Sequence, residues 1–282
     1  MSIDPRTTVG KVSLTVRDLD RVGSFYEDVV GLASLDGSED RRTLGVDGQA
    51  LVELLADPGA PIAPRRSTGL YHLAILVPSV GDLARALQRL IEARWPLVGA
   101  ADHLVSEALY LEDPEGNGIE IYRDRPRDEW RRDGDEIAMA TLPLDLQQLL
   151  GHLDGEGTQG MPAGTQMGHV HLHVADLAAA ERFYGGLLGL DVTARGYPGA
   201  LFMSAGGYHH HIGLNTWAGE GAPPPPEGAA GLHEFEIVLP TRAALEGAVS
   251  RLGEGGVGVE VVGSRAVTRD PSGNSLALTS QS

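Results

Sequence analysis

The same short pattern opens two stretches of this 282-residue chain. Residues 168–177 alternate between polar and aliphatic side chains, as residues 10–19 do, and each stretch is followed at the same spacing by Phe-Tyr and then Gly-Leu. The constant offset, without a gap, indicates an internal duplication. Strict alternation is the period of a strand that buries one face. We therefore predict that each copy begins with a half-buried strand followed by a helix.

The composition excludes several kinds of site and partner. The chain has no cysteine, so it forms neither disulfides nor thiolate metal sites, and any metal must be bound through nitrogen and oxygen. The formal net charge of −17 argues against nucleic acid and anionic membranes as partners. No apolar stretch has the length of a signal peptide or a membrane span. These features predict a cytoplasmic globular protein.

The coarse pattern of strands and helices repeats four times. We predict an α+β fold of four βαβββ units with curved mixed sheets in two tandem domains. Residues 1–126 hold units one and two, and residues 167–282 hold units three and four. Residues 127–166 form a connector with one expected short helix near residues 144–152. A single unit is too small to bury its own sheet, so the units should pair.

Histidines gather in the third unit. Seven of the ten histidines lie between His169 and His233. Three of them alternate along the opening strand at residues 169–173, and three are consecutive at residues 209–211. A single histidine is most often a hydrogen-bonded or surface residue, but six in two short strands indicate a metal or acid–base site.

Equivalent positions of the four units narrow the set of candidate ligands. The first residue on the polar face of the opening strand is a histidine in units two and three, His72 and His169. Units one and four carry Lys11 and Glu234 there. On its closing strand, unit two has Glu120 where unit four has an alanine. Two histidines and one carboxylate therefore combine only as His72, Glu120 and His169. Non-haem Fe(II) oxygenases use this donor set, which leaves open positions for substrate and O₂.

The arrangement resembles the vicinal oxygen chelate superfamily of glyoxalases, bleomycin resistance proteins and extradiol dioxygenases, whose unit is βαβββ. The repeated openings and the Asp-Pro-x-Gly-Asn turns at residues 113–117 and 270–274 carry the resemblance, which covers nearly the whole chain. Within the superfamily, the chain is most similar to two-domain ring-cleaving dioxygenases of the catechol 2,3-dioxygenase type. This resemblance implies Fe(II), with Mn(II) as an alternative, and a small aromatic diol and O₂ as substrates. It also makes a homodimer an expectation.

The resemblance implies roles for individual residues. The metal ligands correspond to His72, Glu120 and His169. Tyr110, ten residues before the glutamate, and His210 correspond to acid–base groups beside the metal. His103 resembles a further histidine of the family that supports the catalytic groups. The residues expected to line the pocket or to support the site are His171, His173, His211, Tyr208 and Trp217.

One departure from the family determines how the units must pair. In the better-known extradiol enzymes units three and four build the site, but unit four here has Glu234 and Ala277 at the ligand positions. We therefore predict that units two and three face each other, within the chain or across a dimer, and that units one and four form a non-catalytic sheet. Three alternatives stay open. They are an isomerase or lyase using Ni²⁺ or Zn²⁺ with His211 as a fourth ligand, a metal-free binding protein of the bleomycin resistance type, and a site that joins His169 to Glu234.

Overall fold

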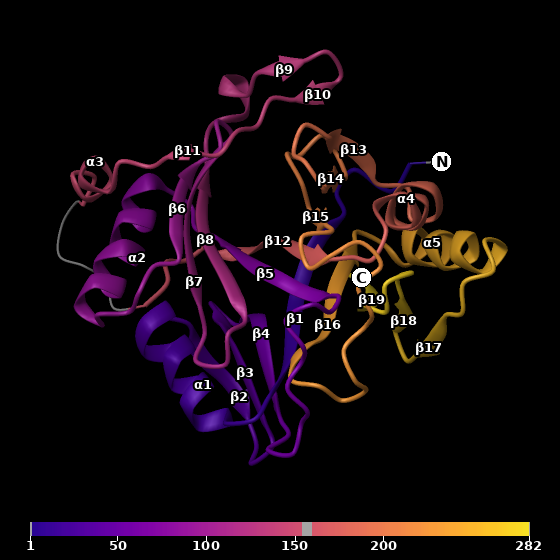
Figure 1. The fold of residues 1–282 in the computed structure, drawn as a ribbon, viewed down its shortest axis with the longest axis horizontal. Helices are drawn as coiled ribbons and strands as arrows, with labels where there is room; N and C mark the ends of the chain where they lie inside the picture. The colour runs from indigo at the N-terminus through magenta and orange to yellow at the C-terminus, as the bar shows by residue number, and fades with distance from the viewer. Residues whose placement is uncertain (1, 154–159, 282) are drawn as a thin grey trace.

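The computed structural model describes residues 2–153 and 160–281. The two halves of the chain share two large sheets, and each sheet joins one unit of each half (Figure 1). Units one and four form the first sheet, and units two and three form the second. The predicted pairing of the units is confirmed, and it takes place within one chain. Part of the predicted connector, residues 154–159, lies outside the described residues.

The first sheet has eight strands, and its centre is an antiparallel pair between the opening strands of units one and four. Unit one supplies β1 (Thr8–Val16), β2 (Ala33–Gly37), β3 (Arg41–Val46) and β4 (Gln49–Ala56). Unit four supplies β16 (Gly231–Leu239), β17 (Glu260–Val262), β18 (Arg265–Arg269) and β19 (Ser275–Ser280). The order across the sheet is β17-β18-β19-β16-β1-β4-β3-β2.

The second sheet has nine strands and repeats this plan. Unit two supplies β5 (Gly69–Leu76), β6 (Gly99–Asp102), β7 (Ser106–Glu112) and β8 (Gly118–Asp124). Unit three supplies β12 (Gln166–His173), β13 (Asp191–Ala194), β14 (Ala200–Ser204) and β15 (Ile212–Asn215). The connector adds β11 (Leu142–Pro143) at one edge, so the order is β11-β6-β7-β8-β5-β12-β15-β14-β13.

The helices follow the opening strands, as predicted. Units two and four contain α2 (Val80–Glu92) and α5 (Arg242–Glu254). In units one and three the expected single helix is instead a short α-helix that continues as a π-helical turn. These are α1 (Leu19–Phe25) followed by Tyr26–Val30, and α4 (Leu177–Glu181) followed by Arg182–Leu187. The Phe-Tyr pairs of both units lie where the α-helix becomes π-helical. They are buried and belong to the core rather than to a substrate pocket. No helix within residues 2–153 and 160–281 is long and apolar enough to cross a membrane.

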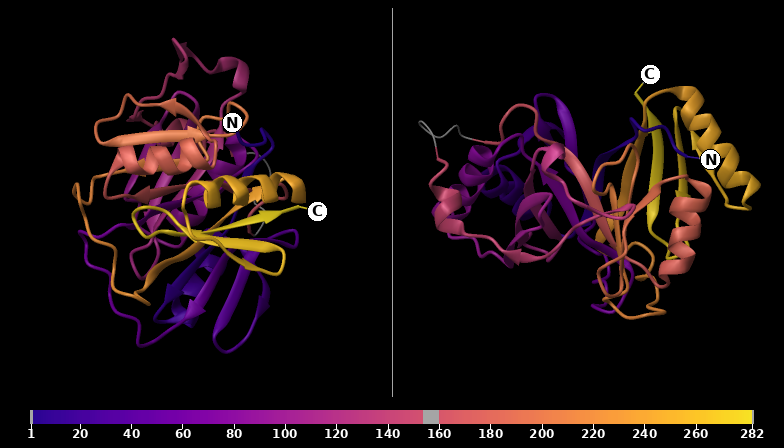
Figure 2. Two further views of the ribbon diagram at one scale, coloured as in Figure 1. Left: turned by 90° about the vertical axis from the view of Figure 1, so that its right-hand side faces the viewer. Right: turned by 90° about the horizontal axis from the view of Figure 1, so that it is seen from above.

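The helices also tie the two sheets together within each half. The helices of units one and two lie on one side of the molecule, and those of units three and four lie on the opposite side (Figures 1 and 2). Arg89 of α2 donates a hydrogen bond to the carbonyl of Val30, 3.0 Å away, at the end of the unit-one helix. Arg251 of α5 does the same at the end of the unit-three helix, to Leu187 (3.0 Å) and Leu188 (2.9 Å). Each unit therefore pairs with one neighbour through its strands and with another through its helix.

The elements that the sequence pattern did not predict are short or lie at edges. The βαβββ pattern requires strands in the places of β2, β6 and β13, but the periodicity did not locate their residues; β2, for example, is largely exposed and so lacks an alternating pattern. The connector is not free of strands: besides β11 it forms a two-stranded hairpin of β9 (Arg132–Asp133) and β10 (Glu136–Ile137). It also contains a short helical turn at Arg127–Glu129 and, within the predicted helical stretch, α3 (Leu146–Leu150). These elements depend on tertiary contacts that periodicity does not encode.

We expect Gly168→Ala to destabilise the second sheet by about 1–3 kcal/mol, because it overpacks a filled core. A Cβ at this position of β12 would overlap the buried hydroxyl of Tyr122. The free energy of unfolding in urea measures the effect. Gly186→Ala is the control, because a Cβ there meets no atom within 4 Å. Equal unfolding free energies for the two variants would contradict this packing.

Candidate metal centre

The three predicted ligands meet at the centre of the second sheet. Strand β5 lies between β8 and β12, and Ala74 of β5 is paired with Glu120 on one side and with His169 on the other. Paired residues on neighbouring strands point to the same face of a sheet, and His72, two residues before Ala74, shares that face. The small side chain of Ala74 leaves the space between the ligands open. Register alone therefore brings the three side chains together.

The distances between these side chains are those of a compact donor set. One carboxylate oxygen of Glu120, Oε2, lies 3.0 Å from His72 Nε2 and 3.2 Å from His169 Nε2. The donor atoms of the three residues all lie within 4.8 Å of one another, and all three side chains are buried. Among the described residues, no fourth histidine or acidic side chain joins this cluster.

The protonation states of the cluster suit a cation. Burial lowers the pKa of His169 to about 4, so its imidazole is neutral near neutral pH. Burial alone would raise the pKa of Glu120, but His169 and then His72 hold it well below its usual range. Although His72 Nε2 lies 3.0 Å from Glu120, this contact lacks hydrogen-bond geometry, and the nitrogen has no other partner among the described residues. Metal ligands need neutral imidazoles and an ionised carboxylate, and a cation would engage both this nitrogen and the carboxylate. The residues therefore fit a divalent metal ion.

Tyr110 is held beside this cluster by His103 and the connector. The Nδ1 of His103 lies 2.7 Å from the carbonyl of Ala140, and its Nε2 lies 2.6 Å from the hydroxyl of Tyr110. Because a carbonyl only accepts, Nδ1 carries the proton, so Nε2 accepts a hydrogen bond from the tyrosine. Burial and then the charge of Glu120 raise the pKa of Tyr110 well above its usual value. The phenol therefore stays protonated, with its oxygen close to the cluster.

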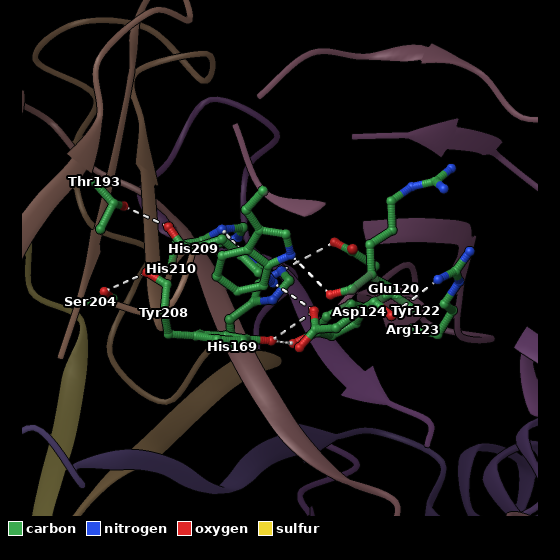
Figure 3. A network of polar contacts seen from close by, with 12 residues as sticks. Glu120, Tyr122, Arg123, Asp124, His169, Thr193, Ser204, Tyr208, His209 and His210 are labelled. Atoms are coloured by element: carbon green, nitrogen blue, oxygen red, sulfur yellow. Dashed lines mark hydrogen bonds and ion pairs between the residues drawn. The ribbon is translucent and has the colours of Figure 1, made fainter. Parts of the chain in front are cut away.

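His210 approaches the cluster from the other side. His210 lies beside His169 (Figure 3), with the two ring centroids 4.1 Å apart. Its side chain also lines the cavity described below. Burial lowers the pKa of His210 well below its usual value. The three consecutive histidines were expected to belong to a strand, but β15 begins only at Ile212, and His209, His210 and His211 lie in the loop before it. In a strand, successive side chains point alternately to only two faces. In a loop, the three histidines can point in three different directions.

A cavity of about 390 Å³ opens in front of the cluster. Its volume is within the range of about 300–1,000 Å³ that is usual for small-molecule sites. The connector contributes Met139 and Thr141 to its wall. Among the described lining residues there is no lysine or arginine, and the charged ones are Glu112 and Glu120. The cavity is therefore apolar and aromatic with an acidic end; its aromatic lining is Tyr71, Tyr110, Tyr197, Phe202 and Trp217.

The expected pocket residues divide into two groups. His171 and Trp217 line the cavity, as predicted.

The other three expected residues lie outside the cavity lining. His173, His211 and Tyr208 do not line it and are held elsewhere, so the expectation that they support the site stays a prediction. His173 Nδ1 lies 2.6 Å from the side-chain oxygen of Asn215, further along the strand. His211 Nδ1 accepts a hydrogen bond from the backbone N–H of Ala205 at 3.1 Å, and His211 is not part of the donor cluster, so it is not a fourth ligand. Tyr208 instead supports the site from behind, 2.7 Å from the hydroxyl of Tyr122.

Several cavity residues were not predicted from the sequence. Tyr71, next to His72, and Phe202 of β14 line the cavity, as do Met139 and Tyr197 from irregular segments that carry no periodic signal. Asp124 could have been found, because it follows Glu120 by an even number of residues on β8 and so shares its face. Its carboxylate lies 2.9 Å from His209 Nε2.

The first sheet has ion pairs where the second has the donor cluster. Glu53 of β4 is the counterpart of Glu120, which the sequence comparison overlooked, and Lys11 stands in the place of His72. The amine of Lys11 lies 3.0 Å from Glu53, and Ser13 donates to the same carboxylate at 2.9 Å. Glu234 pairs with Arg265. The proposed site of His169 with Glu234 is wrong, because the two residues lie in different sheets.

Comparisons with known proteins agree with this architecture. A family model described as the Glyoxalase/Bleomycin resistance protein/Dioxygenase superfamily matches residues 8–121 and 166–278. The chain is 44% identical over 275 residues to the catechol-2,3-dioxygenase of Bacillus subtilis (strain 168), with 96% of each chain covered. It is 30% identical over 131 residues to biphenyl-2,3-diol 1,2-dioxygenase 3 of Rhodococcus globerulus, covering 44% of this chain and 66% of that one.

Solved structures share the fold. A putative dioxygenase from Bacillus subtilis has a TM-score of 0.70 at 15% identity, covering 99% of this chain and 86% of that chain. Glyoxalase I from Zea mays has a TM-score of 0.59 at 17% identity, covering 97% and 92%. At these identities the structural likeness supports the fold alone. The family match over both halves and the near full-length relative show that this chain belongs to the glyoxalase/bleomycin resistance protein/dioxygenase superfamily.

Proposed function

We propose that this protein is an extradiol ring-cleaving dioxygenase that inserts O₂ into a catechol-type diol at a mononuclear Fe(II) site. The observation that carries the proposal is the buried set of His72, Glu120 and His169 at the end of an aromatic cavity. The name of the full-length relative from Bacillus subtilis supports the same reaction class. The rival isomerase requires four protein ligands, and His211, its expected fourth ligand, is bonded to the backbone of Ala205 instead.

His72, Glu120 and His169 would hold the metal ion. When bound, a divalent ion supplies Lewis acidity that lowers the pKa of a diol hydroxyl, together with open positions for the diol and O₂. Two histidines and one carboxylate suit Fe(II), and Mn(II) is the alternative ion. All three ligands are buried, and His72 and Glu120 line the cavity, so substrate would reach a bound ion from the cavity.

Two side chains orient the diol and move its protons. Tyr110 donates a hydrogen bond to His103, which leaves a lone pair of the phenol oxygen free to accept a hydrogen bond from a diol hydroxyl. His210, on the opposite side of the cluster, takes a proton from the substrate and later returns it to an oxygen of the opened ring. The aromatic residues of the cavity wall, including Tyr71 and Trp217, offer apolar surface on which the ring of the diol would pack. The product is a muconic semialdehyde-type acid.

Turnover of neutral and carboxylated catechols tests this proposal. We expect protein loaded anaerobically with Fe(II) to form a yellow product from catechol and 4-methylcatechol in air. For 3,4-dihydroxyphenylacetate we expect kcat/KM to be lower by at least about tenfold, because no cationic side chain in the described cavity lining compensates the desolvation of the carboxylate. Chelator-treated protein is the control, and Mn(II)-loaded protein identifies the working metal. Colourless mixtures with all these catechols would overturn the assignment.

A further inference from the structure

A chain of hydrogen bonds runs from the protein surface to His210. Asp124, at the end of β8, has a partly exposed carboxylate that lies 2.9 Å from Nε2 of His209. The other ring nitrogen of His209, Nδ1, lies 2.8 Å from Nδ1 of His210 (Figure 3). His209 is fully buried, so both of its ring nitrogens depend on protein partners. The three side chains thus form one continuous path.

The carboxylate of Asp124 determines the donor and the acceptor in each of these hydrogen bonds. An ionised carboxylate only accepts hydrogen bonds, so Nε2 of a neutral His209 must carry the proton that it donates to Asp124. Nδ1 of His209 then presents a lone pair and accepts a hydrogen bond from the N–H of His210 Nδ1. The remaining nitrogen of His210, Nε2, has no protein hydrogen bond among the described residues, and it belongs to a ring that lines the cavity.

The surroundings fix His209 in this orientation. The backbone carbonyl of His209 accepts a hydrogen bond of 2.6 Å from the hydroxyl of Thr193. The rings of Tyr208 and Trp130 flank its imidazole, with centroids at 4.1 Å and 5.3 Å. Tyr208 also donates to Asp124 at 3.2 Å, which holds the carboxylate in line. None of these contacts reaches the metal cluster directly, so they act on His210 through His209.

We propose that Asp124 and His209 are positioning residues that hold His210 in the tautomer whose unprotonated Nε2 faces the cavity. In this state His210 can take a proton from a substrate hydroxyl. The catalytic consequence rests on the proposed ring-cleaving function, whereas the tautomer itself does not. A purely structural role for Asp124 would require only that it stabilise the loop before β15.

The kinetic test compares three variants of the Fe(II)-loaded full chain with catechol as the substrate. In Asp124→Asn the side-chain amide can donate a hydrogen bond to His209 Nε2, which reverses donor and acceptor in both hydrogen bonds of the path. We therefore expect kcat to fall about 10- to 100-fold, with KM changed less than about twofold. Asp124→Glu keeps the carboxylate and should restore part of kcat. Glu107→Gln is the matched control, because Glu107 lies on the neighbouring strand β7 and pairs with Arg123 and Arg125 rather than with a histidine. An equal loss of kcat in Glu107→Gln and Asp124→Asn would overturn the proposal.

The tautomer is measured separately by ¹⁵N NMR of histidine-labelled, Zn²⁺-loaded full-length protein. We expect an unprotonated Nε2 and a protonated Nδ1 for His210 in the unmodified chain, and the opposite or a mixture in Asp124→Asn. A protonated Nε2 in the unmodified chain, or the same tautomer in both proteins, would overturn the inference. If the expected tautomers appear but no catechol is cleaved, the positioning of His210 is supported and the proposed function fails instead.

Discussion

Replacing Glu120 by glutamine is expected to abolish stoichiometric iron binding and to lower catechol turnover by at least about a thousandfold. The variant keeps the size of the side chain but removes the one negative charge between two buried imidazoles. Metal catalysis supplies several kcal/mol of transition-state stabilisation, and each 1.36 kcal/mol is about tenfold in rate. Iron content after anaerobic loading and gel filtration, together with initial rates, measures the effect.

Glu53→Gln is the matched control for this experiment. Glu53 occupies the equivalent position in the first sheet, where it is paired with Lys11 at 3.0 Å. We expect this variant to bind iron and to turn over catechol as the unmodified protein does. Iron that is lost from Glu53→Gln but retained by Glu120→Gln would place the metal in the other sheet and contradict the assignment.

Replacing His210 by phenylalanine is expected to lower kcat by about 10²–10⁴-fold, the usual contribution of a general acid–base group. Iron binding should be retained, because His210 lies beside the ligands and is not part of the donor cluster. Phenylalanine preserves the packing against Phe202, whose ring centroid is 4.8 Å away. Steady-state kinetics combined with iron analysis separates the loss of proton transfer from the loss of the metal.

His233→Gln is the control for the removal of a histidine. His233 is exposed on the first sheet, where its Nδ1 lies 3.4 Å from the hydroxyl of Thr15. Its replacement should leave both kcat and iron content unchanged. If His210→Phe and His233→Gln gave the same kcat, His210 would have no role in proton transfer.

The sequence was informative wherever strand periodicity determined the geometry. Alternation along β5 and β12 places His72 and His169 on one face, and the duplication showed that only units two and three carry histidine at this position. Pairing of those units followed from the absence of ligands in unit four, and the sheet order confirms it. Equivalent positions in a repeat therefore carried more information than any single motif.

The sequence was uninformative where loops and tertiary contacts determine the geometry. His209, His210 and His211 are consecutive in a loop, and which of them faces the cavity depends on contacts such as the one between His211 and Ala205. The connector reaches the cavity through Met139, although nothing in its composition indicates that contact. The role of Glu53 was missed because its partner is a lysine, which converts a ligand position into an ion pair.

The central claim is that one metal ion bridges the two halves of the chain between β5, β8 and β12. An anomalous difference map at the iron absorption edge, from crystals of the Fe(II)-loaded protein, tests it most directly. We predict a single peak in contact with His72 Nε2, His169 Nε2 and the Glu120 carboxylate. A peak bound to other side chains, or side chains of these three residues that point into separate pockets, would contradict the account.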